Sequence, residues 1–454
     1  MKRTRVIAIV AAGTVVASVL GACSGGSDGG DGGKDGSDGP VTISVMEFQQ
    51  TRIDAVGKLI PGFEAEMKKQ GKDIKVKLVA DVLTDDQFKT KVTQQLIAKQ
   101  APDLIDIGDS LVPGWAGAGY LAPLDDYLKD WDGWNHYYPQ IKKAMVRQDG
   151  KIYALAHETG VQNLFYRKDQ LTEFGVDTAQ PATWNDLIAR LEQIKQRTGG
   201  NPIVIPAGTA WGGSTWTEGF QPILGGTDKN YYSLQTGKWD LKSPGFRAVF
   251  DLYYTMYSKG LLPVQDLENP NPWEPTKYVK FPAGKIQVSA QGTSGWKFDW
   301  GPDGKAPIKG LNEKVDTWQY PGLRGGDSPF GWSGLGFGYG IPVSSSHKDA
   351  AMLLAEYLST GKPLADQLVS SGAASPRDDL AGVKPYADEP KLLQAGKDLA
   401  TSVYVPTGDG SEQVAQAVAA ATELIINGKA NGAQAYDAFL KNATDLLGPN
   451  LVKE

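Results

Sequence analysis

Apolar residues between positions 41 and 108 follow two different spacings. Continuous or alternating apolar runs at 41–48, 73–80 and 103–108 predict three strands. Between these runs, apolar residues recur every three or four positions, which predicts helices. The helical positions are Ile53, Val56, Ile60, Phe63 and Met67, followed by Phe88, Val92, Leu96 and Ile97. Strands that alternate with helices predict a parallel sheet, so the expected fold class is α/β.

Polar residues stand directly after two of these predicted strands. Ligands of parallel α/β sheets bind beyond the carboxyl ends of the strands. This rule indicates residues 47–50 after the first strand, where Gln49 is our candidate, and Asp109 and Ser110 after the third.

The later part of the chain contains a glycine-rich strand. Gly334, Gly336, Gly338 and Gly340 alternate with larger side chains, so one face of an extended strand is free of side chains. The spacing does not match a dinucleotide-binding loop, and the segment ends at Pro342 where such a loop would open a helix. Upstream, Thr183 and Asp186 predict a capped helix that ends at Gly199. A chain of 454 residues is too long for one small core and favours two lobes.

The N-terminus has the layout of a secretory signal. Lys2, Arg3 and Arg5 precede an apolar run at 6–20 that is short for a permanent membrane span. Leu20-Gly21-Ala22-Cys23 resembles the lipobox of bacterial lipoproteins, in which the cysteine receives diacylglycerol. We therefore expect a signal peptide over 1–22, a lipid anchor at Cys23 and a flexible Gly/Ser/Asp linker to residue 40. The alternative is an ordinary signal peptide with an incidental cysteine.

Composition excludes several functional classes. A net charge of −6 argues against a broad surface for nucleic acid. His136, His157 and His347 are scattered, and the single cysteine precedes the fold, so we expect no metal site. Neither a G-x-S-x-G motif nor a Walker loop occurs after the Gly/Ser/Asp linker, and we expect no cofactor and no catalysis. Twelve Trp and eighteen Tyr would suit a secreted protein that stacks aromatic rings on its ligand.

Four stretches in order resemble one protein family. They are "APDLIDIGDSLVPGWAGAGYLAPLDDYL", "GKIYALAHETGVQNLFYRKDQLTEFGVD" with "PATWNDLI", "FPAGKIQVSAQGTSGW" and "GFGYGIPVSSSHKDAAMLLAEYL". They are similar to family 1 extracellular solute-binding proteins of bacterial ABC sugar importers, of the maltodextrin-binding type. The resemblance implies a two-lobed periplasmic-binding-protein fold of type II, with a ligand cleft and a hinge. We expect an N-terminal lobe of 41–157 plus 316–370 and a C-terminal lobe of 158–315 plus 371–454.

The resemblance also implies ligand contacts. The polar candidates are Gln49, Asp109, Ser110, Glu158, Asn163 and Arg377. Glu158 lies at the expected first crossing between the lobes, where a ligand contact and a structural hinge hydrogen bond are both open. The aromatic candidates are Trp211, Trp216, Trp296 and Trp332, of which we expect about half to face the cleft. Trp296 follows "GTSG", where relatives place a stacking tryptophan, and core packing is its alternative role.

The predicted function is capture of a saccharide and its delivery to an ABC permease. We expect a monomer that is lipid-anchored through Cys23 on the extracellular face of the bacterial membrane. The stretch "MEFQQ" at the end of the first strand differs from many relatives, in which a Trp-containing segment is common. This difference leaves the identity of the saccharide open. The alternatives are a surface-anchored glycoside hydrolase, which would need a carboxylate pair about 5–9.5 Å apart, and a sugar-sensing lipoprotein without a transporter.

Overall fold

The fold is described from a computed structural model that places residues 40–227, 231–324, 327, 331–402 and 408–453. Residues 1–39 form a separate unit from residues 40–454, and the description below concerns only the second unit. The predicted signal peptide, Cys23 and nearly all of the linker lie outside the described residues. Within those residues, no helix has both the length and the apolar character needed to cross a bilayer.

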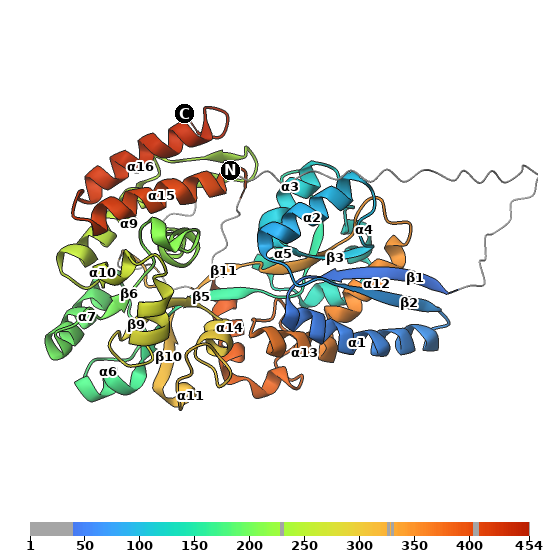
Figure 1. The fold of residues 1–454 in the computed structure, drawn as a ribbon, viewed down its shortest axis with the longest axis horizontal. Coiled ribbons are helices and arrows are strands. Elements are labelled where there is room, and N and C mark those ends of the chain that lie inside the picture. The colour runs from blue at the N-terminus through green and yellow to red at the C-terminus, as the bar shows by residue number, and fades with distance from the viewer. Residues whose placement is uncertain (1–39, 228–230, 325–326, 328–330, 403–407, 454) are drawn as a thin grey trace, which may run out of the picture. The chain divides into compact units, whose positions relative to one another are not determined.

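The first sheet has the strand order β2-β1-β3-β12-β4 (Figure 1). Its strands are β1 (Val41–Glu47), β2 (Ile74–Ala80), β3 (Leu104–Gly108), β12 (Phe337–Gly340) and β4 (Ala154–Ala156). The first three strands are parallel, as the alternation of strands and helices predicted, whereas β12 runs antiparallel to β3 and β4. Helices α1 (Gln50–Lys69), α2 (Asp85–Ile97), α12 (Lys348–Leu358) and α13 (Gly361–Ser371) belong to this lobe, and α1, α2 and α12 place buried side chains in its cores.

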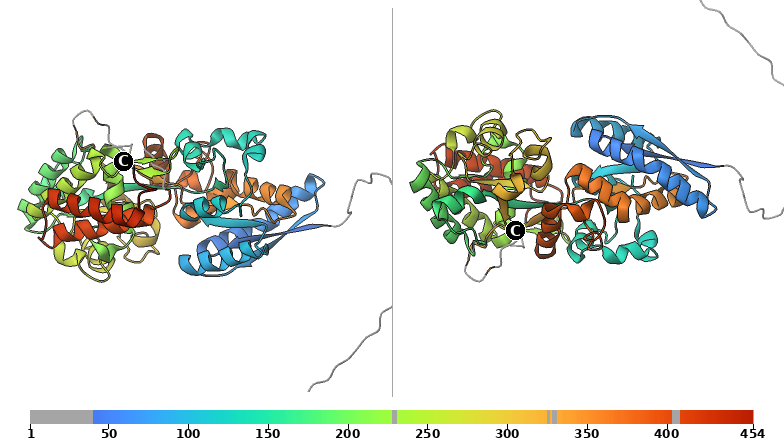
Figure 2. Two further views of the ribbon diagram at one scale, coloured as in Figure 1. Left: turned by 90° about the horizontal axis from the view of Figure 1, so that it is seen from above. Right: turned by 90° about the horizontal axis from the view of Figure 1, so that it is seen from below.

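The second sheet has the order β10-β5-β9-β6, with β11 also paired to β5. Its strands are β5 (Gly160–Arg167), β6 (Ile203–Val204), β9 (Val288–Gly292), β10 (Val315–Trp318) and β11 (Trp332–Gly334). One large core joins this sheet to α7 (Trp184–Thr198), α9 (Pro244–Ser258), α15 (Ser411–Ile426) and α16 (Gly432–Leu447), which Figure 2 shows from above and below. The predicted cap of α7 is present, because the Thr183 side chain accepts a hydrogen bond from the Asp186 amide at 3.2 Å.

The glycine-rich strand is broken where the chain passes from one sheet to the other. Gly336 has φ +67°, a backbone conformation that favours glycine, and it separates β11 from β12. β11 pairs in the second sheet, while β12 pairs in the first. An added Cβ at Gly340 would lie 2.4 Å from Ile107 Cδ1, so the predicted close approach at the glycine face is present. The expected single strand is thus two strands joined by a left-handed residue.

Two chain segments connect the two sheets. The first lies between β4 and β5, and the second is the β11–β12 junction. Thr159 of the first connection and Ala374, which packs in a first-lobe core, exchange two backbone hydrogen bonds of 3.0 and 2.9 Å. β10 pairs in the second sheet, and α14 (Pro390–Thr401) packs Ala395 and Leu399 into a first-lobe core. The exact lobe boundaries given above remain a proposal.

Candidate functional site

A charged pair marks the carboxyl end of β3. Asp109 begins the turn after this strand, and its carboxylate lies 3.0 Å from the Arg147 guanidinium. Arg147 is buried and also donates to the Ala144 carbonyl oxygen at 3.1 Å. Ser110 is exposed beside Asp109, and Gln49 is half-buried at the start of α1. The strand-end rule therefore located polar side chains that border solvent on the first lobe.

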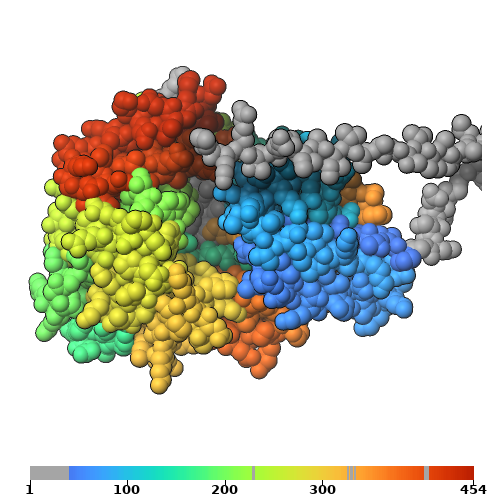
Figure 3. Space-filling view, viewed as in Figure 1, coloured from blue at the N-terminus to red at the C-terminus, as the bar shows by residue number. Residues whose placement is uncertain are grey.

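Arg147 also lines a pocket shared by the two lobes. This pocket has a volume of about 590 Å³ and lies between first-lobe residues that include Arg147, Asp149 and Tyr153 and second-lobe residues that include Tyr232 and Asp409. Figure 3 shows the surface hollowed between the blue first lobe and the green and yellow second lobe. The Tyr153 hydroxyl donates to the Asp149 carboxylate at 2.6 Å, and this bond, with burial, raises the pKa of Tyr153 to about 12. The pocket wall therefore combines a cation, hydrogen-bonding groups and tyrosine rings.

Glu158 lies on the first connection, and its carboxylate is held by Arg52 of α1. The two side chains are 2.5 Å apart, and Arg52 also contacts the Asp106 carboxylate at 3.0 Å. All three residues are buried. Burial alone would raise the pKa of Asp106, but Arg52 and His157, whose Nε2 lies 2.8 Å away, lower that pKa to about 2. Asp106 therefore stays ionised beside Arg52.

Glu47 completes the buried carboxyl cluster at the end of β1. It is fully buried, and the Tyr339 hydroxyl donates to its Oε1 at 3.3 Å. Burial and the neighbouring negative charge of Asp106 raise the pKa of Glu47 well above its ordinary value. The raised pKa favours the neutral form of Glu47, whereas Asp106 and Glu158 both contact the Arg52 guanidinium. This arrangement favours a structural contribution from Glu158 and leaves a ligand contact through its second oxygen as a proposal.

The second lobe brings together three π-helical turns of the described chain. They are η4 (Thr215–Phe220), η5 (Glu274–Lys280) and η6 (Gly295–Asp299). Lys277 of η5 is fully buried, pairs with Glu218 of η4 and lies 3.3 Å from the Gln291 side-chain oxygen. Gln291 in turn donates to Asp299 of η6. Single π-turns occur frequently at functional sites, and here they place charged groups in contact that the sequence spacing did not suggest.

Trp211 and Trp216 point into the core of this lobe. They are only 1% and 3% exposed, and Trp211 packs on Trp273 with ring centroids 4.8 Å apart. Neither indole nitrogen has a hydrogen-bond partner among the described residues. The segment between them includes exposed Gly212 and Gly213. The loop itself therefore borders solvent, while its two large rings are packed inside.

Trp296 lies in η6 and is half-buried. Its ring contacts Phe165 at a centroid distance of 4.8 Å, and the Lys391 ammonium lies 4.6 Å from the ring centroid. Lys391 is itself paired with Asp316 at 3.0 Å. Trp296 lines a cavity of about 830 Å³ between the segment 296–313 and residues of α13 and α14. This cavity is larger than the pocket beside Arg147, and it too is lined by both lobes, but the position of Asp109 and Arg147 at a strand end makes the pocket beside Arg147 our candidate ligand site.

The remaining candidates have different surroundings. Asn163 is buried and donates to Asp398 of α14 at 2.8 Å. Arg377 is buried and makes a two-pronged contact with Asp379 at 2.9 and 2.6 Å. The backbone of Trp332 pairs with Gln162, and its side chain lies outside the described structure. The side-chain nitrogens of Asn163 and Arg377 thus donate to carboxylates of the protein itself.

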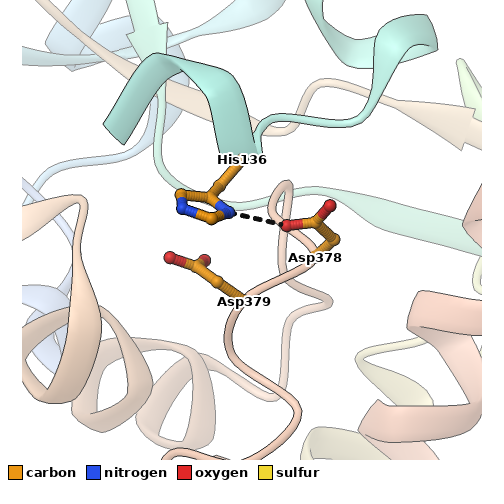
Figure 4. Close-up of side chains that lie close together, drawn as sticks. All are labelled: His136, Asp378 and Asp379. Atoms are coloured by element: carbon orange, nitrogen blue, oxygen red, sulfur yellow. Dashed lines mark hydrogen bonds and ion pairs between the residues drawn. The ribbon is translucent and has the colours of Figure 1, made fainter. Parts of the chain in front are cut away.

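One exposed group of potential metal ligands occurs among the described residues. Ligand atoms of His136, Asp378 and Asp379 lie within 4.8 Å of one another, and Figure 4 shows the His136 ring directed at Asp378. His136 Nδ1 lies 3.1 Å from Asp378, while Asp379 pairs with Arg377. These contacts account for the cluster as a set of surface ion pairs and hydrogen bonds.

Sequence reasoning missed four residues that organise these sites. They are Arg52, Arg147, Lys277 and Phe337. Arg52 lies on the buried face of α1, in line with the apolar residues of that helix. A cation on this face was the one sequence feature that could have indicated a buried ion pair. Arg147 and Lys277 follow no strand and belong to no motif. Their partners come from distant segments, so no local pattern could identify them.

Comparisons with known proteins identify relatives that share parts of the sequence. The chain is 32% identical to the diacetylchitobiose-binding protein DasA of Streptomyces coelicolor over 215 residues, which are 46% of this chain and 47% of that protein. It is 29% identical to an arabinooligosaccharide-binding protein of Halalkalibacterium halodurans over 142 residues, 30% of each chain. The matches thus span about a third to a half of these curated relatives.

Solved structures share the fold over nearly the whole described unit. The sugar-binding protein MalE of Xanthomonas citri superposes with a TM-score of 0.74 at 22% identity, covering 90% of this chain and 97% of that one. A cyclic α-maltosyl-1,6-maltose-binding protein of Arthrobacter globiformis gives 0.73 at 20% identity, covering 90% and 99%. These similarities confirm the predicted two-lobed α/β fold.

The model of one family matches most of the chain. It covers residues 63–395, a range that includes both sheets except for β1. The resemblance seen in the sequence is thereby confirmed at the level of the family. The chain belongs to the bacterial extracellular solute-binding proteins.

Proposed function

We propose that this protein captures a saccharide between its two lobes and delivers it to the permease of an ABC importer. The relatives and neighbours above are named for oligosaccharides, including diacetylchitobiose and arabinooligosaccharides. Another relative, from Bacillus subtilis, is named as a melibiose/raffinose/stachyose-binding protein and is 26% identical over 150 residues. These names support an oligosaccharide of two or more units as the ligand.

The observation that carries the proposal is the Asp109–Arg147 pair beside the pocket between the lobes. A sugar presents neighbouring hydroxyl groups that can donate to a carboxylate and accept from a guanidinium. Hydrogen bonds to charged groups are stronger than those between neutral groups. Because the two charges neutralise each other, the pair suits an uncharged ligand rich in hydroxyls. Ser110 and Gln49 lie near the same strand ends and complete the polar set we propose.

Binding between two lobes also supports transport. Ligand contacts from both lobes stabilise a closed arrangement, and a permease can distinguish it from the open one. A ligand drives this change only through contacts that are tighter in the closed state. We further propose that binding is reversible and that no bond is broken. This proposal is supported by the carboxylates described above, each of which is engaged in an ion pair. Asp106 and Glu158 are buried against Arg52, and Asp109 is held by Arg147.

A thermal-shift screen tests the saccharide proposal. The purified full-length protein in detergent would be mixed with N,N′-diacetylchitobiose, arabinotriose, maltotriose, melibiose and raffinose, one at a time. A ligand at 100 times its dissociation constant adds about 2.7 kcal/mol of stability, which gives a measurable rise in melting temperature. Asp109→Asn should reduce the rise. Absence of a shift with every saccharide would overturn the proposal, and product formation detected by chromatography would replace it with the hydrolase alternative.

We also propose that Cys23 anchors the protein on the extracellular face of the membrane and that the protein acts as a monomer. The short apolar run, the lipobox-like residues and the polar linker support the anchor. Cys23→Ala should yield unprocessed or released protein that does not incorporate labelled fatty acid. Normal membrane retention and normal labelling of this variant would contradict the anchor without affecting the ligand proposal.

A further inference from the structure

Phe337 is an aromatic residue beside the Asp109–Arg147 pair that the sequence did not single out. It begins β12, is only partly buried, and lines a small recess together with Asp109, Arg147 and Met145. The backbone amide of Asp109 donates to the carbonyl oxygen of Gly336 at 3.0 Å, so both residues are held by the same turn. An aromatic side chain and an ion pair therefore share one edge of the first sheet.

Arg52 supports Phe337 from behind. Its guanidinium carbon lies 3.5 Å from the ring centroid, and its nitrogens are held by Asp106 and Glu158. Arg52 is 7% exposed, so this contact is shielded from solvent. A cation over an aromatic face is a favourable contact, and the two carboxylates fix the position of the cation. The ring is therefore held in one place by a buried network that reaches the first connection between the lobes.

Trp296, the expected stacking residue, lies apart from the Asp109–Arg147 pair. Phe165 and the Lys391 ammonium both lie within 5 Å of its ring centroid, and Lys391 is fixed by Asp316. Its cavity is lined by α13 and α14 and contains neither Asp109 nor Arg147. A saccharide on Phe337 would meet the ion pair directly, whereas a saccharide on Trp296 would not.

We propose that Phe337 is the specificity-determining apolar contact of the first lobe, with Arg52 as its positioning residue. The inference rests on the proposed function and names the part of the ligand concerned. A pyranose has an apolar C–H face and a rim of hydroxyl groups. Its C–H face would lie on Phe337 while its hydroxyls reach Asp109 and Arg147. The ligand class is thus a saccharide that presents a pyranose ring to the first lobe.

Calorimetric titration of variants tests Phe337. The probe is the saccharide of the above panel that gives wild-type protein its largest thermal shift. Phe337→Leu should weaken binding about tenfold, because a stacked aromatic contact is lost. Phe337→Tyr keeps the ring and should stay within about threefold of wild type. Phe298→Leu, which removes a partly exposed ring at the Trp296 cavity, is the matched control and should bind as wild type.

The opposite pattern would overturn the proposal. If Phe337→Leu binds as wild type while Trp296→Leu loses about tenfold, the stacking residue lies in the other cavity. If no saccharide shifts the wild-type melting temperature, the proposed function fails first and this inference with it. Binding to wild type with an unchanged Phe337→Leu variant defeats only the inference. Unliganded melting temperatures of all variants show whether a lost affinity reflects lost folding.

The test of Arg52 needs a control arginine that is equally buried and also ion-paired. Arg190 is also 7% exposed, and it pairs with Asp177 and Asp186 in the second lobe. Arg52→Met and Arg190→Met should both lower the melting temperature, but only Arg52→Met should weaken saccharide binding, by about tenfold. Arg52→Lys should recover part of the affinity. Equal affinities for the two methionine variants would mean that Arg52 is purely structural.

Discussion

The two lobes use their conspicuous side chains in opposite ways. In the first lobe, the charged pair Asp109–Arg147 and the ring of Phe337 border a pocket or recess at the strand ends. In the second lobe, Trp211 and Trp216 pack inside the core, and Lys277, which pairs with Glu218, lies 5.4 Å from the Trp211 ring centroid. The large aromatic rings singled out at Trp211 and Trp216 are thus packed inside the second lobe, whereas Asp109 and Phe337 of the first lobe are only partly buried.

The loop that carries Trp211 and Trp216 shows how the second lobe hides its aromatic rings. Trp211 lies in the short helical turn η3 (Thr209–Trp211) and Trp216 lies in η4. Both rings are buried, whereas Trp296 in η6 is half-buried. Exposed Gly212 and Gly213 lie between the two buried rings, so the second lobe presents small residues at the loop where the sequence suggested aromatic rings.

The largest expected effect is on folding and concerns Trp216. Removal of a buried tryptophan costs about 3–5 kcal/mol of unfolding free energy. We expect Trp216→Ala to lose this amount in a denaturant titration, and to retain its affinity for the saccharide when measured at a temperature where it is folded. Trp296→Ala should lose less stability because its ring is only half-buried. A Trp216 variant of normal stability and weak binding would reverse the comparison between the lobes.

Local sequence signals predicted the fold of both lobes well. The apolar spacing placed β1, β2, β3, α1 and α2, and the capping residue Thr183 placed the start of α7. These elements are determined by neighbouring residues. The split at Gly336 was not predicted, because alternating glycines fit a single strand equally well until the partners in two separate sheets are known.

The candidate site was only partly accessible from sequence. Asp109 follows a predicted strand, so the strand-end rule could locate it. Arg147, 38 residues later, forms the other half of the pair. Arg52 and Glu158 are 106 residues apart, and Lys277 and Glu218 are 59 apart. Contacts over such separations depend on the packing of whole elements, and a single sequence without partners to compare does not encode them in any local pattern.

A smaller effect is expected at the ligand wall, where Asp109→Asn separates binding from folding. The substitution keeps the shape of the side chain and removes the charge that faces Arg147. Hydrogen bonds to charged groups contribute about 1.5–3 kcal/mol, so saccharide binding should weaken by about ten- to a hundredfold. Unfolding free energy should change by less than about 1 kcal/mol, because Asp109 is partly exposed.

Titration calorimetry and urea unfolding of the same preparation would measure both quantities. Thr217→Ser, a conservative change at an exposed position of η4, serves as the second-lobe control and should leave both unchanged. If Asp109→Asn instead unfolds easily and binds normally, then the Asp109–Arg147 pair is structural, and the first lobe resembles the second in its use of charge.

The smallest effect concerns pH and a second comparison, between two carboxyl groups of the first lobe. Asp106 is paired with Arg52, whereas burial raises the pKa of Glu356 in α12 to about 7, with only the charge of Lys72 opposing the shift. A raised carboxyl pKa gives stability that is complete below the unfolded pKa of about 4.3 and is lost as the pH rises through 7. Because Glu356 is partly exposed, we expect the free energy of unfolding to fall by only about 1–2 kcal/mol between pH 5 and pH 8.

Urea titrations over this pH range test the assignment. Glu356→Gln should remove this part of the pH dependence, whereas Glu173→Gln, at an exposed position, should keep it. An unchanged slope in Glu356→Gln would mean that another group, such as Glu47, accounts for the loss of stability.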